Sequence, residues 1–122
     1  MGTLAGQVAV ITGASRGIGA AITRTLGECG AHVVINYANS SGPAEALADE
    51  VRGLGSGSEP LIIQADVTDE AQARGLVERA REHYGRVDIL VNNAAITRDR
   101  TFRKLTSDDW RRVIDITEPS GN

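Results

Sequence analysis

The sequence is poor in the residues that cross-link or fill out the core of a small protein. Its single cysteine, Cys29, excludes a disulfide within the chain. Aromatic residues make up only 3% of the 122 residues, so Val, Ile, Leu and Ala must form the core. No apolar run approaches the roughly 20 residues of a membrane-spanning helix. Residues 1–6 lack the basic and apolar segments of a signal peptide. These absences predict a cytoplasmic protein without membrane contact.

Positive charge is scattered along the chain, which contains 13 lysine and arginine residues. The chain contains one lysine, Lys104, and its net charge is −3. Because a nucleic-acid-binding surface needs clustered basic residues, we expect no nucleic-acid partner. The length corresponds to a single domain. Glycine, in contrast, is abundant with 14 residues, and the positions of these glycines carry the argument below.

Short β-branched runs alternate with amphipathic segments along most of the chain. Four runs predict strands, at residues 7–12, 32–36, 61–65 and 87–91. Three amphipathic segments predict helices, from Ile18 to Cys29, from Pro43 to Leu54 and from Thr68 or Asp69 to Tyr84. This alternation predicts an α/β fold. We expect a Rossmann-like, three-layer α/β/α architecture whose parallel sheet has four strands in the order 3-2-1-4.

The apolar positions also predict which face of the first helix is buried. One stripe along this helix comprises Ile18, Ile22, Leu26 and Cys29. Gly30 follows the stripe and is placed to end the helix.

Beyond Val91 the pattern becomes irregular. The segment Thr106-x-x-Asp109 resembles a capping box and predicts a further helix that carries Trp110, Val113 and Ile114. Since the chain ends before the further strands and helices that would cover the fourth strand, we expect an unpaired parallel edge and an unburied apolar face there, which favour aggregation.

A glycine-rich loop, Thr12–Gly19, joins the first predicted strand to the first predicted helix. Gly13, Gly17 and Gly19 have the spacing Gly-x-x-x-Gly-x-Gly, which differs from both the common dinucleotide fingerprint and the P-loop. A helix N-terminus that follows a sharp turn presents free N–H groups to a pyrophosphate, and glycine lets the backbone come close. The alternative is a merely flexible turn. The place of this loop between a strand and a helix favours the binding interpretation.

A second loop, Asn92-Asn93-Ala94-Ala95, follows the fourth predicted strand. If the first and fourth strands are neighbours, the two loops flank the point where the strand order reverses, and open α/β sheets bind ligands there. Asn92 or Asn93 could tie one strand end to the next, because an amide both donates and accepts hydrogen bonds. The alternative is that both are ordinary turn residues.

Together these motifs resemble the short-chain dehydrogenases/reductases, from about Gly6 to Asp115. The resemblance depends on Thr-Gly-x-x-x-Gly-Ile-Gly at 12–19, Asp66-Val67 after the third strand, and Asn-Asn-Ala at 92–94. It implies that the glycine loop holds the cofactor pyrophosphate, that Asp66 and Val67 lie beside the adenine, and that Asn92 and Ala94 line the nicotinamide ribose. Ala95 replaces the usual glycine of the family, and its methyl group crowds that contact. The implied loop contacts are Gly13, Ser15, Arg16, Gly17, Ile18 and Gly19.

The residues after the second strand bear on which cofactor is bound. NAD-binding folds place a carboxylate there to accept a hydrogen bond from the ribose 2′-hydroxyl. This chain has Asn36, Tyr37, Ala38 and Asn39 instead, and Arg16 in the glycine loop can pair with a 2′-phosphate. The sequence therefore predicts NADP(H) rather than NAD(H), with contacts from Asn36 and Tyr37. The alternative for Arg16 is a solvated loop charge.

Residues 95–110 resemble the 3-oxoacyl-thioester reductases of this family, which include 3-oxoacyl-[acyl-carrier-protein] reductases and acetoacetyl-CoA reductases. That resemblance implies reduction of a 3-oxoacyl thioester to its 3-hydroxyacyl form by NADPH, in a homotetramer. A basic cluster nearby would contact a phosphopantetheine carrier, or else is a solvated face; it comprises Arg98, Arg100, Arg103 and Lys104.

The chain ends before the residues that do the chemistry in this family. In family members an Asn, a Ser, and a Tyr and Lys four residues apart supply the proton for the substrate oxygen and the hydrogen-bond donors around it. This chain has no Tyr-x-x-x-Lys, and Thr117 occupies the position of the Asn. We therefore expect a truncated NADP-binding half-domain at 1–116, an unrelated tail at 117–122, no catalytic residue and no metal. The alternatives are a non-catalytic NADP(H)-binding fragment and an inactive relic.

Overall fold

The computed structural model describes residues 3–93 and 112–115, and the side chains of residues 3–93. Its strands are β1 (Val8–Ile11), β2 (His32–Tyr37), β3 (Leu61–Gln64), β4 (Ile89–Asn92) and β5 (Arg112–Asp115). Its helices are α1 (Gly17–Glu28), α2 (Ser41–Arg52) and α3 (Glu70–Tyr84). The helix that was expected to start at Pro43 begins two residues earlier, after the N-cap residue Ser40. None of these helices is both long and apolar enough to cross a membrane.

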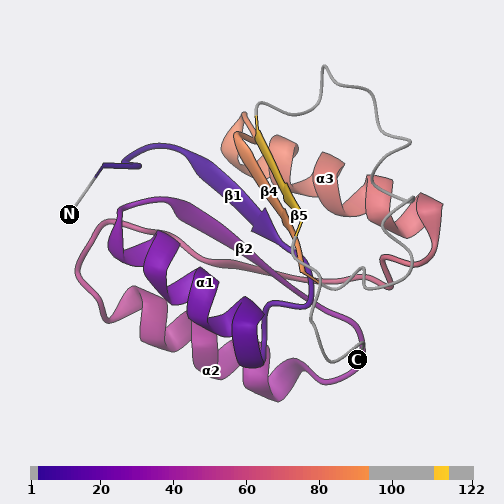
Figure 1. Cartoon of the computed structure of the whole chain (residues 1–122), viewed down its shortest axis with the longest axis horizontal. Helices are drawn as coiled ribbons and strands as arrows, with labels where there is room; N and C mark the ends of the chain where they lie inside the picture. Colours follow the sequence, from indigo (N-terminus) through magenta and orange to yellow (C-terminus); the bar gives the residue numbers. More distant parts are fainter. Residues whose placement is uncertain (1–2, 94–111, 116–122) are drawn as a thin grey trace.

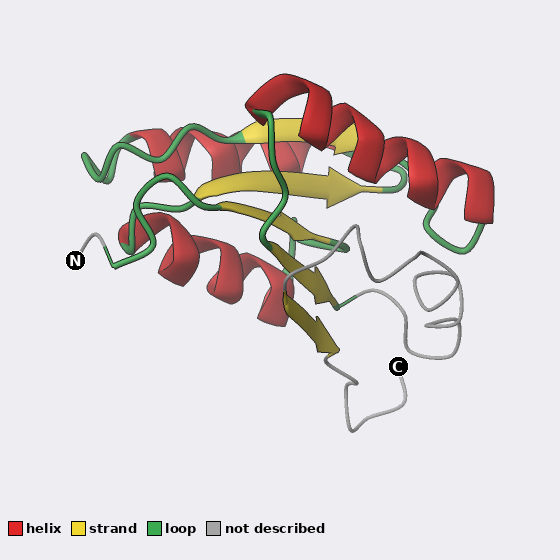
Figure 2. Cartoon of the chain, turned by 90° about the horizontal axis from the view of Figure 1, so that it is seen from above, coloured by secondary structure: helices red, strands yellow, loops and turns green. Residues whose placement is uncertain are grey.

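The strands form one parallel sheet in the order β3-β2-β1-β4-β5. Helices α1 and α2 lie on one face and α3 on the other (Figures 1 and 2). The α/β class, the three layers and the order 3-2-1-4 are thus confirmed. Because all these strands are parallel, their carboxyl ends lie at the same edge of the sheet.

Alternate side chains of each strand enter the two halves of the core. In β1, Val8 and Val10 pack toward α3, whereas Ala9 and Ile11 pack toward α1 and α2. All four are at most 1% exposed. This explains why the strands are continuous apolar runs rather than alternating ones, because both faces of a parallel sheet are covered by helices.

The prediction of a helix through Val113 and Ile114 is wrong at these residues. Residues 112–115 form β5, which pairs with β4 from Ile89↔Arg112 to Asn92↔Asp115. β4 is therefore not the unpaired edge that was expected from the sequence. The outer side of β4 offers unpaired backbone groups to a β-branched segment, and this pairing outweighs a weak helical pattern.

The prediction for the buried face of α1 is also wrong in part. Gly19, Ala20, Thr23 and Gly27 form the buried face. Ile22 and Leu26 are only partly buried against the core, and Ile18 is 41% exposed. Small residues let α1 approach its neighbours closely; a Cβ on Gly27 would lie 3.2 Å from Cγ1 of Val51 in α2. The expected end of the helix is confirmed, since Gly30 has a φ of +94°.

A buried carboxylate, Asp88, joins the amino ends of β1 and β4, at the edge of the sheet opposite the carboxyl ends of the strands. Asp88 accepts hydrogen bonds from the Val8 amide at 2.9 Å and from Arg86 at 2.7 and 2.8 Å. The Asp88 side chain is 4% exposed, whereas that of Arg86 is 48% exposed. The hydrogen bonds to Asp88, and then its charge, raise the pKa of Arg86. The buried carboxylate thus fixes where the two central strands begin.

Candidate functional site

Each glycine of the loop between β1 and α1 has a structural reason. Gly13 has a φ of +59° and Gly17 a φ of +54°, a region that other residues rarely adopt. Gly19 is required by close approach instead. A Cβ there would lie 2.5 Å from the Gly13 carbonyl oxygen and 2.7 Å from Nδ2 of Asn93. In this turn glycine is therefore required by backbone angle at two positions and by close packing at the third.

Two asparagines hold this loop from opposite sides. The Gly13 amide donates to Oδ1 of Asn36 at the end of β2, at 3.1 Å. The Gly13 carbonyl accepts from Nδ2 of Asn93, which follows β4, at 3.1 Å. Next to it, the Thr12 amide donates to the Val91 carbonyl at 3.0 Å. The loop is thus anchored to both strands that flank β1, where the order of the strands reverses.

The N-terminus of α1 begins directly after the loop. The first N–H groups of a helix have no partner within the helix, and together with the helix dipole they favour an anion. Arg16 is the N-cap residue, and its side chain makes no capping hydrogen bond. The first turn of α1 contains no acidic residue. This end of the helix is therefore suited to a phosphate group.

A small open pocket of about 220 Å³ lies beside the loop and the end of β2. It is lined by Ser15, Arg16, Tyr37, Ala38, Asn39 and Ser40. None of these six residues carries a carboxylate, and Arg16 makes no ion pair within the described part of the chain. The pocket thus combines one cation with hydroxyl and amide groups, a set that suits an anionic ligand.

The segment after β3 forms a compact turn that begins α3. The Asp66 carboxylate accepts from the hydroxyl of Thr68 at 2.6 Å and from its amide at 3.0 Å. These two hydrogen bonds lower the pKa of Asp66. The Asp66 amide donates to Gln72 at 2.8 Å. Val67 is buried. Asp69 caps α3 by accepting from the Ala71 amide at 3.1 Å, as one of the two expected caps.

Two buried amide oxygens at the end of β4 have no hydrogen-bond partner within the described part of the chain. They are Oδ1 of Asn92 and Oδ1 of Asn93, from residues that are 2% and 7% exposed. A buried acceptor without a partner costs about 1–3 kcal/mol, so such atoms are rare without a function. Asn93 lies beside the glycine loop, because its Nδ2 donates to the Gly13 carbonyl at 3.1 Å, and both oxygens offer an acceptor at this end of β4.

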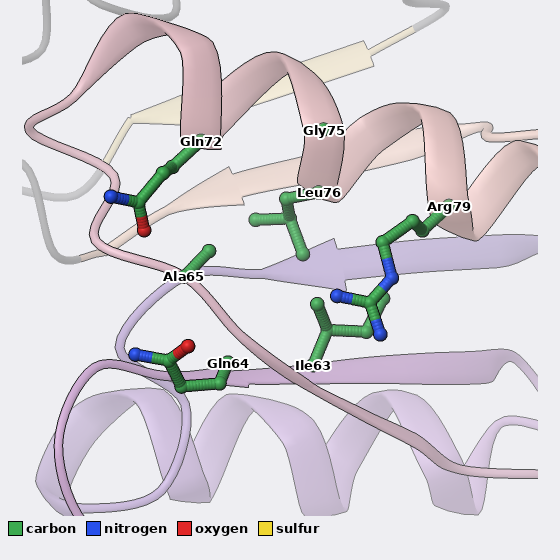
Figure 3. A pocket seen from close by; sticks show the side chains of 7 residues that line it. All are labelled: Ile63, Gln64, Ala65, Gln72, Gly75, Leu76 and Arg79. Atoms are coloured by element: carbon green, nitrogen blue, oxygen red, sulfur yellow. The ribbon is translucent and has the colours of Figure 1, made fainter.

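A separate hollow lies between β3 and α3 (Figure 3). Figure 3 shows Arg79 of α3 extending over Ile63 of β3, with Gly75 and Leu76 along the helix. The polar groups at its other end are already engaged. Gln64 donates to the Ala38 carbonyl at 2.7 Å, and Gln72 binds both Asp66 and Asp69. We therefore place the functional site at the carboxyl edge of the sheet and not in this hollow.

Most residues expected at the site lie at this edge. The structure brings the glycine loop, Asn36, Tyr37 and Asn92 to it, with Asp66 and Val67 after β3. Several expected positions lie outside the described residues. They are Ala94, Ala95, Thr117, the basic cluster and the rest of the segment 95–110 that resembles the thioester reductases. Asn93 was not among the residues expected to bind the cofactor. It was considered as a tie from one strand end to the next, and its hydrogen bond to the Gly13 carbonyl shows that role. The signal in the sequence that points to Asn93 is a polar residue directly after a buried strand.

Comparison with known proteins places these features in a family. Residues 7–118 match the family described as short chain dehydrogenase. A 3-oxoacyl-[acyl-carrier-protein] reductase of Synechocystis sp. is 41% identical over 116 residues, which cover 95% of this chain and 46% of the relative.

Solved structures agree with this match. A short chain dehydrogenase from Burkholderia cenocepacia J2315 in complex with NADP has 44% identity and a TM-score of 0.72, over 87% of this chain and 42% of that one. A 7α-hydroxysteroid dehydrogenase complexed with NADH and 7-oxo glycochenodeoxycholic acid has 39% identity and a TM-score of 0.68, over 74% of this chain and 34% of that one. The chain thus spans less than half the length of these relatives.

Proposed function

This chain belongs to the short-chain dehydrogenase family, and from that premise we propose that its carboxyl-edge site binds a nicotinamide dinucleotide, NADP(H) in preference to NAD(H). The observation that carries the preference is the pocket beside the loop, which presents Arg16 and no carboxylate. When bound, such a cofactor supplies a hydride. The residues of this chain bind and position it.

The described residues fit the cofactor in two respects. Gly19 lets the loop pack directly against its neighbours, since a Cβ there would lie 2.5 Å from the Gly13 carbonyl oxygen, and the helix end that follows this loop has N–H groups suited to a pyrophosphate. Oδ1 of Asn92 is a buried acceptor without a partner among the described residues, and a ribose hydroxyl is a suitable donor for it. Ser15 and Ile18 extend the same surface; Ile18 is an exposed apolar side chain at the first turn of α1.

The preference for NADP(H) follows from charge. A 2′-phosphate beside Arg16 gains charge-assisted hydrogen bonds, and no neighbouring carboxylate in the pocket repels it. A ribose 2′-hydroxyl lacks the carboxylate that NAD-binding folds offer it. The side chain of Asn36 cannot replace that carboxylate, because it points to Gly13, Ile63 and Ala65 inside the protein.

Arg16→Ala is expected to weaken NADPH binding by about 10- to 100-fold, which corresponds to the loss of a hydrogen bond to a charged group. NADH affinity is expected to change less than about twofold, since NADH has no 2′-phosphate. Isothermal titration of both cofactors against wild type and variant measures this directly.

Arg24→Ala is the matched control. Arg24 lies on the same helix but pairs with Glu50 at 3.1 Å, so its removal should leave both affinities unchanged. If Arg16→Ala weakens NADPH and NADH equally, Arg16 does not select the cofactor. Tighter binding of NADH than of NADPH by the wild type would refute the proposed preference.

For the whole protein we propose reduction of a 3-oxoacyl thioester to the 3-hydroxyacyl form. The support is the similarity to the Synechocystis 3-oxoacyl-[acyl-carrier-protein] reductase, together with the sequence of residues 95–110. Other members of the family act on other ketones, such as the 7-oxo steroid bound in one neighbour. The thioester is therefore the substrate to test first.

The 122-residue chain on its own is expected not to oxidise NADPH with acetoacetyl-CoA. Ketone reduction needs a proton donor for the developing alkoxide, and no tyrosine here is followed by lysine four residues later. Tyr84 is no substitute, because its hydroxyl donates to the Glu59 carbonyl, and burial, with a smaller effect of the Glu59 charge, raises its pKa. Loss of NADPH absorbance measures turnover, with the full-length Synechocystis reductase as positive control. Turnover above the enzyme-free rate would contradict this expectation.

A second candidate is a dinucleotide-binding chain without catalysis, favoured by the absence of a Tyr-x-x-x-Lys motif from the sequence. Thermal unfolding with and without cofactor separates a binder from an inactive relic. Saturation at about 100 times the dissociation constant stabilises a folded binder by roughly 2.7 kcal/mol. An unchanged melting temperature would indicate a relic.

A further inference from the structure

The buried side chain of Asn36 forms hydrogen bonds to separate segments of the site. Its Oδ1 accepts from the Gly13 amide at 3.1 Å, and its Nδ2 lies 3.3 Å from the Ile63 carbonyl and 3.1 Å from the Ala65 carbonyl. Its own backbone carbonyl accepts from the Ala14 amide at 3.0 Å. The residue is 2% exposed. One buried amide thus joins the glycine loop, β2 and the carboxyl end of β3.

The polarity of these contacts requires an amide. One side of the group faces an N–H, and the other faces only carbonyl oxygens, so the position needs an acceptor and a donor together. A carboxylate at position 36 would face the Ile63 and Ala65 carbonyls with no proton to donate. An alanine would leave a buried amide and two carbonyls short of partners.

The three segments that Asn36 joins bear the two halves of the proposed cofactor site. The loop leads into the helix end that is suited to a pyrophosphate, and the end of β3 leads directly into Asp66 and Val67, the segment proposed to lie beside the adenine. Asn36 itself lies behind both surfaces, buried in the protein. It therefore acts on a ligand through the backbone that it holds and not by contact.

We propose that Asn36 is a positioning residue that couples the pyrophosphate-binding loop to the adenine-binding segment. This inference rests on the proposed function of the site. Its consequence differs from that of Arg16. Loss of Asn36 displaces backbone that every nicotinamide dinucleotide uses, so NADPH and NADH should lose affinity by the same factor. Loss of Arg16 should affect NADPH alone.

The test compares Asn36→Ala and Asn36→Thr with Arg16→Ala and wild type. Circular dichroism first defines a temperature at which each variant is folded, and titration calorimetry then measures NADPH and NADH at that temperature. Asn36→Ala is expected to weaken both cofactors by about tenfold or more, a typical size for coupling between sites. Asn36→Thr keeps a hydroxyl that can form some of the hydrogen bonds of the Asn36 amide, so a smaller loss of cofactor affinity is expected. A merely structural residue would lower the melting temperature and leave the affinities of the folded protein unchanged.

A measurement on the wild type covers the case in which neither variant folds. Hydrogen exchange at the Gly13 amide should slow when NADPH is added, because the bound loop conformation keeps its hydrogen bond to Asn36 closed. Unchanged exchange at Gly13 in the saturated protein, or variants with wild-type affinity, would overturn the inference while leaving the proposed function standing. If the wild type binds neither cofactor, the proposed function itself fails.

Discussion

Gly19→Ala is expected to be the most damaging single-methyl change at the site. The new Cβ would lie 2.5 Å from the Gly13 carbonyl oxygen, 2.7 Å from Asn93 Nδ2 and 3.0 Å from the Ala14 Cα. Two of these atoms belong to backbone, so the loop or α1 must move. Overpacking of this kind costs about 1–3 kcal/mol or more. For a domain of this size each kcal/mol lowers the melting temperature by roughly 4–8 °C.

Displacing the loop should also weaken cofactor binding in the protein that stays folded. Gly13 and Asn93 form the contact that a methyl group would enter, and this contact sets the conformation of the loop. We expect NADPH affinity to fall by about tenfold or more, since the helix N-terminus moves with the loop. Calorimetric titration below the melting temperature measures this separately from stability.

Gly75→Ala is the control, because it makes the same glycine-to-alanine change in a helix without the close approach. Gly75 lies within α3 and borders the open hollow of Figure 3, and a Cβ there meets nothing within 4 Å. Alanine in a helix interior is more favourable than glycine by roughly 0.5–1 kcal/mol. The two variants should therefore shift the melting temperature in opposite directions. A shift of the same sign and size in both would show that close approach at Gly19 is unimportant.

Asp88→Ala is expected to destabilise the fold by about 2–4 kcal/mol without changing the ligand site. The substitution removes a carboxylate that is 4% exposed, together with its two hydrogen bonds to Arg86 and one to the Val8 amide. Val8 begins the central strand, and its amide would be left buried without this acceptor. Denaturant unfolding at neutral pH gives the free energy of unfolding directly.

Asp49→Ala tests whether burial is the reason. Asp49 also pairs with an arginine, Arg52 at 2.9 Å, but both side chains are more than half exposed. Exposed ion pairs contribute about 0–1 kcal/mol, so this variant should be close to wild type. Both variants should bind NADPH with wild-type affinity when folded. Equal destabilisation by the two substitutions would contradict the role assigned to the buried carboxylate.

The fold could be predicted from the sequence because its signals are local. The continuous apolar runs at β1 and β2 predict strands covered on both faces, and their alternation with helices leaves few possible topologies. The glycine loop was placed correctly for the same reason, since Gly13 and Gly17 adopt backbone angles that favour glycine wherever the chain turns this way.

The failures concern interactions between distant segments. Val113 and Ile114 were expected on a helix, but the free side of β4 makes them a strand. The stripe containing Ile18 was expected to be buried, whereas α1 packs through small residues, because the distance between α1 and α2 is set by Val51 and its neighbours. Hydrophobic periodicity alone contains no information about how closely two helices approach.

The sequence by itself determined the class of the fold and the place of the glycine loop, because propensity and periodicity act over a few residues, whereas the order of the first four strands was expected only from the likeness to Rossmann folds. Only the tertiary structure decided what the asparagines do. Asn36 is 23 residues from Gly13 in the sequence, and Asn93 is 80 residues from it. Whether such an amide faces solvent, a ligand or a loop depends on which strands are neighbours in the sheet. The same reason applies to Gly19, whose missing side chain matters only because Gly13 and Asn93 occupy the space beside it.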